Sequence, residues 1–140
     1  MSINDPVAVI WRTDSVIEME HGSLIAFLEG KLSPEQFGDE VAGEVTACNL
    51  ACSQKGEGRI LLTSGPDTIV TRDHARRLLE AVEDRRLTLE IANYTASCII
   101  HGDFEFGDDI VCEAIWLVEM ADIDQPTSDD MRTAIARLMR

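Results

Sequence analysis

The sequence predicts a single helix-dominated (all-α or nearly so) domain of five or six short helices. The chain has 140 residues, of which 45% are hydrophobic, so it can bury one core. Apolar side chains recur every three or four positions along most of the chain, which is the period of an amphipathic helix. Residues that favour helix ends flank these segments. We therefore expect one domain over residues 1–140, with residues 1–13 as an extended N-terminal arm.

Two helices joined by a short turn are predicted near the start of the chain. The first spans Ser15–Leu28, is weakened at Gly22 and ends at Gly30. The second begins at Ser33–Gln36, where Ser and Gln form a capping box and proline takes the first helical position. We expect the two helices to be antiparallel. The second helix carries one apolar stripe, which we expect in the core: Phe37, Val41, Val45, Cys48 and Cys52.

The middle of the chain contains a loop-like segment and then a basic helix. Two short apolar runs within residues 59–71 surround Ser64, Gly65 and Pro66, a pattern that fits a small β-hairpin or a long loop equally well. Thr71 then caps a third helix. Its buried stripe is formed by Ala75, Leu78, Leu79 and Val82. Five arginines lie on this helix or just beyond its end: Arg72, Arg76, Arg77, Arg85 and Arg86.

Two helices that follow carry the most apolar faces of the chain. Thr88 caps the fourth helix and Gly102 ends it, and its inner face holds Ile91, Ala92, Thr95, Cys98 and Ile99. Phe104–Phe106 alternate briefly, and Asp108 and Asp109 then begin a fifth helix. One of its faces contains Ile110, Val111, Ala114, Ile115 and Val118. A second face contains Cys112, Trp116 and Met120, so we expect a central helix covered on two sides, with Trp116 in the core.

The last helix is predicted from Pro126–Ser128 onward. Asp129 and Asp130 in its first turn and Arg137 and Arg140 near its end suit the charges at the two ends of a helix. Its buried positions are Met131, Ala134, Ile135 and Leu138.

The composition excludes several classes of partner and location. Twenty-six Asp and Glu against twelve Lys and Arg give a net charge of −14, which repels phosphate backbones and anionic lipids, so we expect neither nucleic acid nor a membrane as partner. The apolar run Val7–Trp11 is too short for the core of a signal peptide, and no stretch approaches the roughly 20 apolar residues of a spanning helix. The four cysteines lie in helical patterns typical of reduced thiols. We therefore expect a cytoplasmic protein.

A block of acidic residues is the clearest functional candidate. Eight carboxylates occur with no Lys or Arg between them: Asp103, Glu105, Asp108, Asp109, Glu113, Glu119, Asp122 and Asp124. The block is either a solvated face that keeps the protein soluble or a docking surface for a basic protein partner. A third alternative is internal pairing, in which the arginine-bearing third helix packs beside the block.

Docking of a basic partner predicts a non-enzymatic protein–protein interaction module. In size, acidity and helix content the chain resembles bacterial immunity and antitoxin proteins, which shield the basic cleft of a nuclease. The resemblance is one of class and covers no specific motif. It implies binding without catalysis.

A metal site is the alternative hypothesis. Cys48 and Cys52 are one helical turn apart, and Cys98 and His101 are three residues apart, so two facing helices could offer four ligands to zinc in a metal-binding protein or a metal-dependent enzyme. Both pairs also lie on stripes that read as core, which favours buried thiols and no metal. We therefore expect no cofactor.

No set of residues predicts a catalytic centre. His21 and His74 are isolated. For an imidazole in the first turn of a helix, as at His74, we expect a surface role or a neutral hydrogen-bonded ring and not a general base. No nucleophile stands in a known motif, so an enzyme is the less favoured reading. Trp11 lies in the N-terminal arm, which either packs back on the domain or meets a second copy to form a homodimer.

Overall fold

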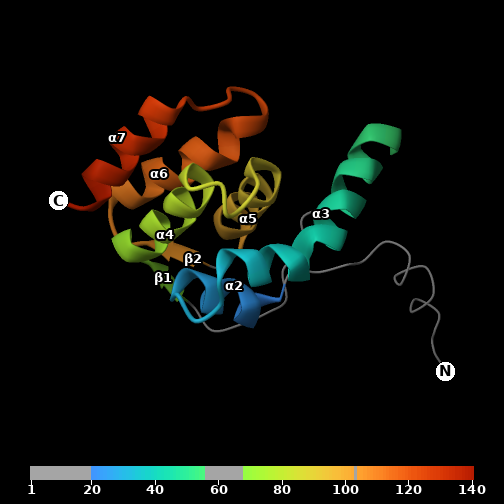
Figure 1. Cartoon of the computed structure of the whole chain (residues 1–140), viewed down its shortest axis with the longest axis horizontal. Helices are drawn as coiled ribbons and strands as arrows, with labels where there is room; N and C mark the ends of the chain where they lie inside the picture. The colour runs from blue at the N-terminus through green and yellow to red at the C-terminus, as the bar shows by residue number, and fades with distance from the viewer. Residues whose placement is uncertain (1–19, 56–67, 103) are drawn as a thin grey trace.

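A computed structural model of the chain confirms the helix-dominated fold. The structure describes residues 20–55, 68–102 and 104–140 (Figure 1). These residues form six α-helices, a 3-10 helix and two short strands. In chain order the elements are α2 (His21–Leu28), α3 (Pro34–Lys55), β1 (Thr68–Val70), α4 (Arg72–Glu83), α5 (Leu89–His101), β2 (Phe104–Phe106), α6 (Asp109–Glu119), η1 (Met120–Asp122) and α7 (Ser128–Leu138). The predicted N-terminal arm lies outside the described residues.

The helices from α3 onward begin where the cap residues predict. The predicted continuous helix Ser15–Leu28 is wrong, because Glu20 is extended and has no side-chain cap hydrogen bond, and α2 begins only at His21. Ser33 Oγ accepts a hydrogen bond from the Gln36 N–H at 3.1 Å, and Gln36 Oε1 accepts one from the Ser33 N–H at 3.2 Å, which forms the predicted capping box. Thr88 Oγ1 accepts from the N–H of Ile91 at 3.2 Å at the start of α5. After α2, Gly30 adopts a φ of +80°, a conformation that glycine takes without a steric penalty. Short-range hydrogen bonds thus fix these helix boundaries.

The helices pack around one cluster of buried apolar side chains. In Figure 1, α4, α5, α6 and α7 form a group, α2 and the first half of α3 lie beside the end that carries the strands, and the second half of α3 extends away from the group. Phe27 of α2 and Phe37 of α3 stack with ring centroids 4.6 Å apart. The largest fully buried side chains are Phe27, Phe37, Leu24, Leu28, Leu78, Leu79, Ile99, Ile115, Val41, Val45 and Val70. No helix in the described ranges combines the length and apolar character needed to cross a bilayer.

The two strands form a parallel pair and connect distant parts of the chain. Thr68 pairs with Phe104 and Val70 with Phe106, and the Gly107 N–H extends the ladder to the Val70 carbonyl at 2.9 Å. A hairpin was one of two predictions for residues 59–71. Residues 59–67 lie outside the described part, and Thr68–Val70 pair with a strand that α4 and α5 separate from them. The described strand is therefore part of a crossover connection.

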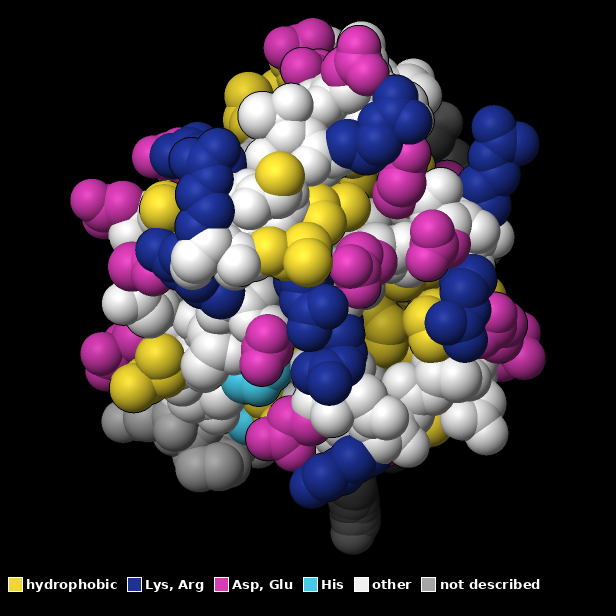
Figure 2. All heavy atoms as spheres, turned by 60° about the vertical axis from the view of Figure 1, so that its left-hand side comes forward, with side chains coloured by type: hydrophobic (Ala, Val, Ile, Leu, Met, Phe, Trp, Pro, Cys, Tyr) yellow, Lys and Arg dark blue, Asp and Glu magenta, His cyan; other side chains and the backbone are white. Residues whose placement is uncertain are grey.

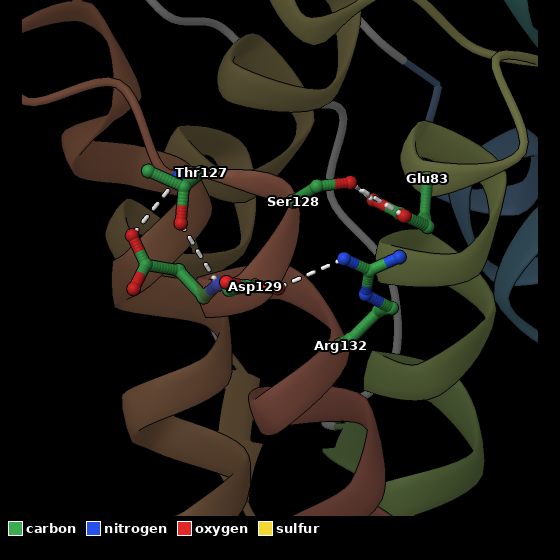
Figure 3. Close-up of polar contacts among 6 residues, drawn as sticks. Glu83, Thr127, Ser128, Asp129 and Arg132 are labelled. Carbon is green, nitrogen blue, oxygen red and sulfur yellow. Dashed lines mark hydrogen bonds and ion pairs between the residues drawn. The ribbon is translucent and has the colours of Figure 1, made fainter.

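Polar contacts hold the start of α7 against the end of α4 (Figure 3). Ser128 Oγ donates to the carboxylate of Glu83 and lies 2.7 Å from Oε2 and 3.1 Å from Oε1. Thr127 and Asp130 form a reciprocal capping box at the start of α7. Arg132 Nη2 lies 2.8 Å from Asp129 Oδ1 one turn along the same helix. The hydrogen bond between Ser128 and Glu83 thus joins α7 to the basic helix α4, and the other two contacts stabilise the first turn of α7 itself.

Among the described residues only one side of α6 is covered, and the prediction of a helix covered on two sides with Trp116 in the core is wrong. Trp116, expected in the core, exposes 42% of its surface, and Met120 exposes 40%. Cys112 is partly exposed. The buried side chains of α6 all lie on its other face. The physical reason is that the contacts of α6 with α4, α5 and α7 bury Val111, Ala114, Ile115 and Val118, whereas no described element covers Trp116 and Met120.

A histidine takes part in the cap of α4. The Thr71 N–H donates to His74 Nδ1 at 3.1 Å, while Thr71 Oγ1 accepts from the His74 N–H at 3.2 Å. Nδ1 can accept a hydrogen bond only when it carries no proton. Burial lowers the pKa of His74 below its ordinary value of 6.5; the Arg77 guanidinium acts in the same direction, and Glu29 and Asp73 oppose it. Of the two expected roles, the structure supports a hydrogen-bonded ring, and accepting at Nδ1 requires its neutral form.

Acidification should weaken this cap. Because the pKa of His74 is lower in the folded than in the unfolded chain, its contribution to stability is complete above about pH 6.5 and is lost as the pH falls through the folded-state pKa. Between about pH 7.5 and pH 5 we expect a loss of up to about 1 kcal/mol at this partly exposed cap, measured by urea unfolding.

The His74→Gln variant is the matched control for this effect. Glutamine keeps an acceptor at the same position, as Gln36 does at the start of α3, but it does not titrate. The variant should lose less stability than the native chain over the same pH range. Equal losses in the two proteins would show that the pH dependence arises from other groups.

Candidate interaction surface on helix α6

A helix cap and an ion pair with Arg72 hold the start of α6 in place. Asp108 Oδ1 accepts a hydrogen bond from the Val111 N–H at 3.0 Å and so caps the helix. Its other oxygen lies 2.8 Å from Nε of Arg72, which also donates from Nη1 to the carbonyl of Arg140 at 3.0 Å. The hydrogen bond from the Val111 amide, and then the one from Arg72, lower the pKa of Asp108. Arg72 thereby ties α4 to the start of α6 and to the end of the chain.

The side chains of α6 divide into an inner and an outer face. Val111, Ala114, Ile115 and Val118 are buried in the core. With 3.6 residues per turn, the opposite face contains Asp109, Cys112, Glu113, Trp116 and Met120. Trp116 lies near the middle of this outer face, so a large aromatic group stands where a solvent-exposed helix usually carries polar residues.

An apolar strip continues from the outer face of α6 into the next turn. The Ile123 N–H donates to the Met120 carbonyl at 3.0 Å across η1, and side chains three residues apart in such a turn lie above one another. Ile123 exposes 77% of its surface. We refer to these four residues as the α6 stripe: Cys112, Trp116, Met120 and Ile123.

Carboxylates border the α6 stripe, and some of them are already paired. Glu113 lies 2.8 Å from Arg137 of α7, and Glu119 accepts a hydrogen bond from Ser97 Oγ at 3.0 Å. Neither Asp109 nor Asp124 forms an ion pair with any described residue, and both are exposed. We refer to Asp109, Glu113, Glu119 and Asp124 as the acidic rim.

The rest of the predicted acidic block has other surroundings. Asp108 is a helix cap, and Glu105 is exposed on β2. Asp103 lies outside the described residues, as does the side chain of Asp122. The pairing of Asp108 with Arg72 agrees with the alternative of internal pairing with the basic helix. The block is therefore divided between structural contacts and an exposed rim.

Most described arginines are paired within the fold. Arg86 contacts both carboxylate oxygens of Glu35, at 2.9 and 3.0 Å, and Arg77 donates to the Leu28 carbonyl at 2.9 Å. Figure 2, which brings the side of the molecule with α4 and α7 forward, shows acidic and basic side chains alternating on that face. Basic groups therefore balance acids on the α4 and α7 side, whereas α6 itself contains no Lys or Arg.

The four residues of the metal hypothesis have contrasting surroundings where they are described. Cys98 is 1% exposed within the core, as predicted for a buried thiol, whereas His101 is exposed at the end of α5. The side chains of Cys48 and Cys52 are not among those described. No group of three or more metal-ligating side chains occurs among the residues that the structure describes. The zinc site stays a prediction.

A signal in the sequence could have identified the outer face of α6. Asp109, Glu113, Trp116 and Met120 are spaced by four, three and four residues and so share one face of the helix. Two carboxylates on that face favour solvent over core. The size and apolar character of Trp116 suggest the opposite, that this face is buried.

The α6 stripe and the acidic rim together form the α6 surface. Comparison of the chain with protein-family models, with curated proteins and with solved structures found no match. The chemistry of the α6 surface therefore follows from the exposure, charge and contacts of its own residues.

Proposed function

We propose that the protein is a binding module that docks a basic protein through the α6 surface. The observation that supports this most is the position of Trp116, exposed on a helix face whose neighbours are carboxylates. Tryptophan and methionine are enriched in protein interfaces, and a small number of such residues contribute most of the binding free energy. An apolar centre with a charged border is the usual anatomy of an interface.

Charge complementarity specifies the partner as basic. The chain has a net charge of −14, and residues 103–131 contain ten Asp and Glu and no Lys or Arg. A positively charged partner is attracted from a distance and acidic competitors are repelled. The basic cleft of a nuclease is one surface with this chemistry, in line with the likeness to immunity and antitoxin proteins in size and acidity. On this proposal the protein binds without catalysis, in the cytoplasm.

Quantitative capture on the immobilised protein tests the proposal. Two variants alter the α6 surface: Trp116→Ala removes the aromatic group, and the double variant Asp109→Asn/Asp124→Asn neutralises two exposed carboxylates of the rim. A second double variant, Asp39→Asn/Asp84→Asn, is the control, because it changes the net charge equally at exposed positions on α3 and after α4.

Basic proteins captured by the native chain should bind the Trp116→Ala variant about 30-fold more weakly, as expected for an interface hot spot of about 2 kcal/mol. The rim variant should bind more weakly than the control variant, and added salt should reduce that difference. Equal binding by the rim and control variants, together with unchanged binding by Trp116→Ala, would contradict the proposal.

A further inference from the structure

A groove between α6 and α7 adjoins the α6 surface. It has a volume of about 270 Å³ and is lined by four residues of each helix. On α6 the lining begins at Ile110 and on α7 at Asp130, and on both helices it continues at the third, fourth and seventh positions beyond. This spacing selects one face of a helix. Two helix faces thus line the groove along its length.

The groove has an apolar floor and charged walls. Ile110, Leu117 and Ala134 are partly buried and pack against the core. Glu113 and Arg137 form an ion pair of 2.8 Å between the two helices. Asp130 lines the groove on α7, where one of its carboxylate oxygens is engaged in the α7 cap. A ligand of this groove would place apolar groups on the floor and positive charge beside Asp130 and the adjoining acidic rim.

The groove and the α6 stripe are continuous. Glu113 lies three residues before Trp116 on α6, and Leu117 lies three before Met120, so the groove residues and the stripe residues are neighbours on the helix surface. Glu113 belongs to both the groove and the acidic rim. A partner that covers Trp116 on α6 would therefore also contact the groove.

We infer that the groove receives an amphipathic helix of the partner, with its apolar face on the floor and Lys or Arg beside the rim. This inference rests on the proposed function and specifies the element that the partner contributes. A helix that docks in a groove between two helices contacts it with side chains three, four and seven residues apart. The residues that line this groove have the same spacing. Glu113 and Arg137 in the groove pair with each other, so the carboxylate of Asp130 and the exposed rim carboxylates Asp109 and Asp124 favour a basic helix.

Two synthetic helical peptides with the same leucine face, one flanked by lysines and one by glutamates, are the probes. Each is titrated into the full-length ¹⁵N-labelled protein, and amide chemical shifts are recorded. The lysine peptide should shift amides in Ile110–Leu117 and Asp130–Arg137 before others, and the glutamate peptide should shift neither range. No binding of the lysine peptide, or equal binding of both peptides, would overturn the inference.

A pair of variants on α7 separates the groove from the rest of the α6 surface. Thr133→Trp fills the groove from an exposed position and should weaken lysine-peptide binding tenfold or more, whereas Ala136→Trp adds the same side chain outside the groove and should not. Unchanged binding to Thr133→Trp with weakened binding to Trp116→Ala would overturn the groove inference and leave the proposed function standing. The capture experiment on basic proteins tests the proposed function independently.

Discussion

Replacing Phe37 with alanine should lower the free energy of unfolding by about 3–5 kcal/mol, a large part of the stability of a domain of this size. Phe37 is fully buried and stacks on Phe27 at 4.6 Å between centroids, so truncation leaves a cavity between α2 and α3 and removes an aromatic contact. The capping box of Ser33 and Gln36 remains, but it cannot offset the lost burial, because such a cap contributes only about 1 kcal/mol.

Urea unfolding followed by far-ultraviolet circular dichroism measures this loss. The Phe37→Leu variant keeps most of the volume and should lose less than about 2 kcal/mol, so it gives a result even where the alanine variant does not fold. A loss below about 1 kcal/mol for Phe37→Ala would mean that the two rings do not pack as described.

Alanine substitutions at Ile115 and Trp116 should have very different effects on stability. Ile115 is fully buried, so its truncation should lower the free energy of unfolding by about 2–5 kcal/mol. Trp116, the larger side chain, is 42% exposed, so its truncation should cost about 1 kcal/mol or less. If Trp116 were in the core, its truncation would instead lower the free energy of unfolding more than truncation of Ile115.

Urea unfolding of the two variants is measured under the same conditions. Their unfolding midpoints can be compared if the free energy of unfolding falls with urea concentration at the same slope in both. A greater loss for Trp116→Ala than for Ile115→Ala would place the tryptophan in the core and remove the basis of the α6 surface. A small effect at Trp116 also shows that this variant can be used in the binding experiment without loss of folding.

Features that depend on neighbouring residues could be predicted from the sequence. The caps formed by Ser33, Thr71, Thr88 and Asp108 involve partners three residues away, so both members of each hydrogen bond appear in one short segment. The buried position of Cys98 follows from the same helical period that places Ile99 in the core. Local chemistry was sufficient for these features.

Features that depend on distant residues could not be predicted in the same way. The strand at Thr68–Val70 pairs with Phe104–Phe106, and nothing within either segment specifies that partner. The exposure of Trp116 depends on which elements cover α6, and periodicity alone gives two apolar faces without deciding between them. The helix period therefore predicts burial only where a second element is known to pack on the face.

The candidate site shows the same division. The acidic residues could be found from the sequence, but their pairing could not be assigned, since Arg72 and Asp108 are 36 residues apart. The structure assigns structural contacts to Asp108 and leaves Asp109 and Asp124 exposed. The apolar residues Cys112, Trp116 and Met120 form a regular helical stripe in the sequence, and such a stripe predicts burial, whereas the structure leaves Trp116 and Met120 exposed.

The parallel arrangement of β1 and β2 has a consequence for how the chain folds. The strands are parallel and are not joined by a tight turn. Their pairing therefore cannot begin at a turn and extend along the strands, as it does in a hairpin. The intervening residues of α4 and α5 must first collapse together and bring Val70 close to Phe106. The smallest element of the molecule therefore depends on the cooperative assembly of the two helices between its strands.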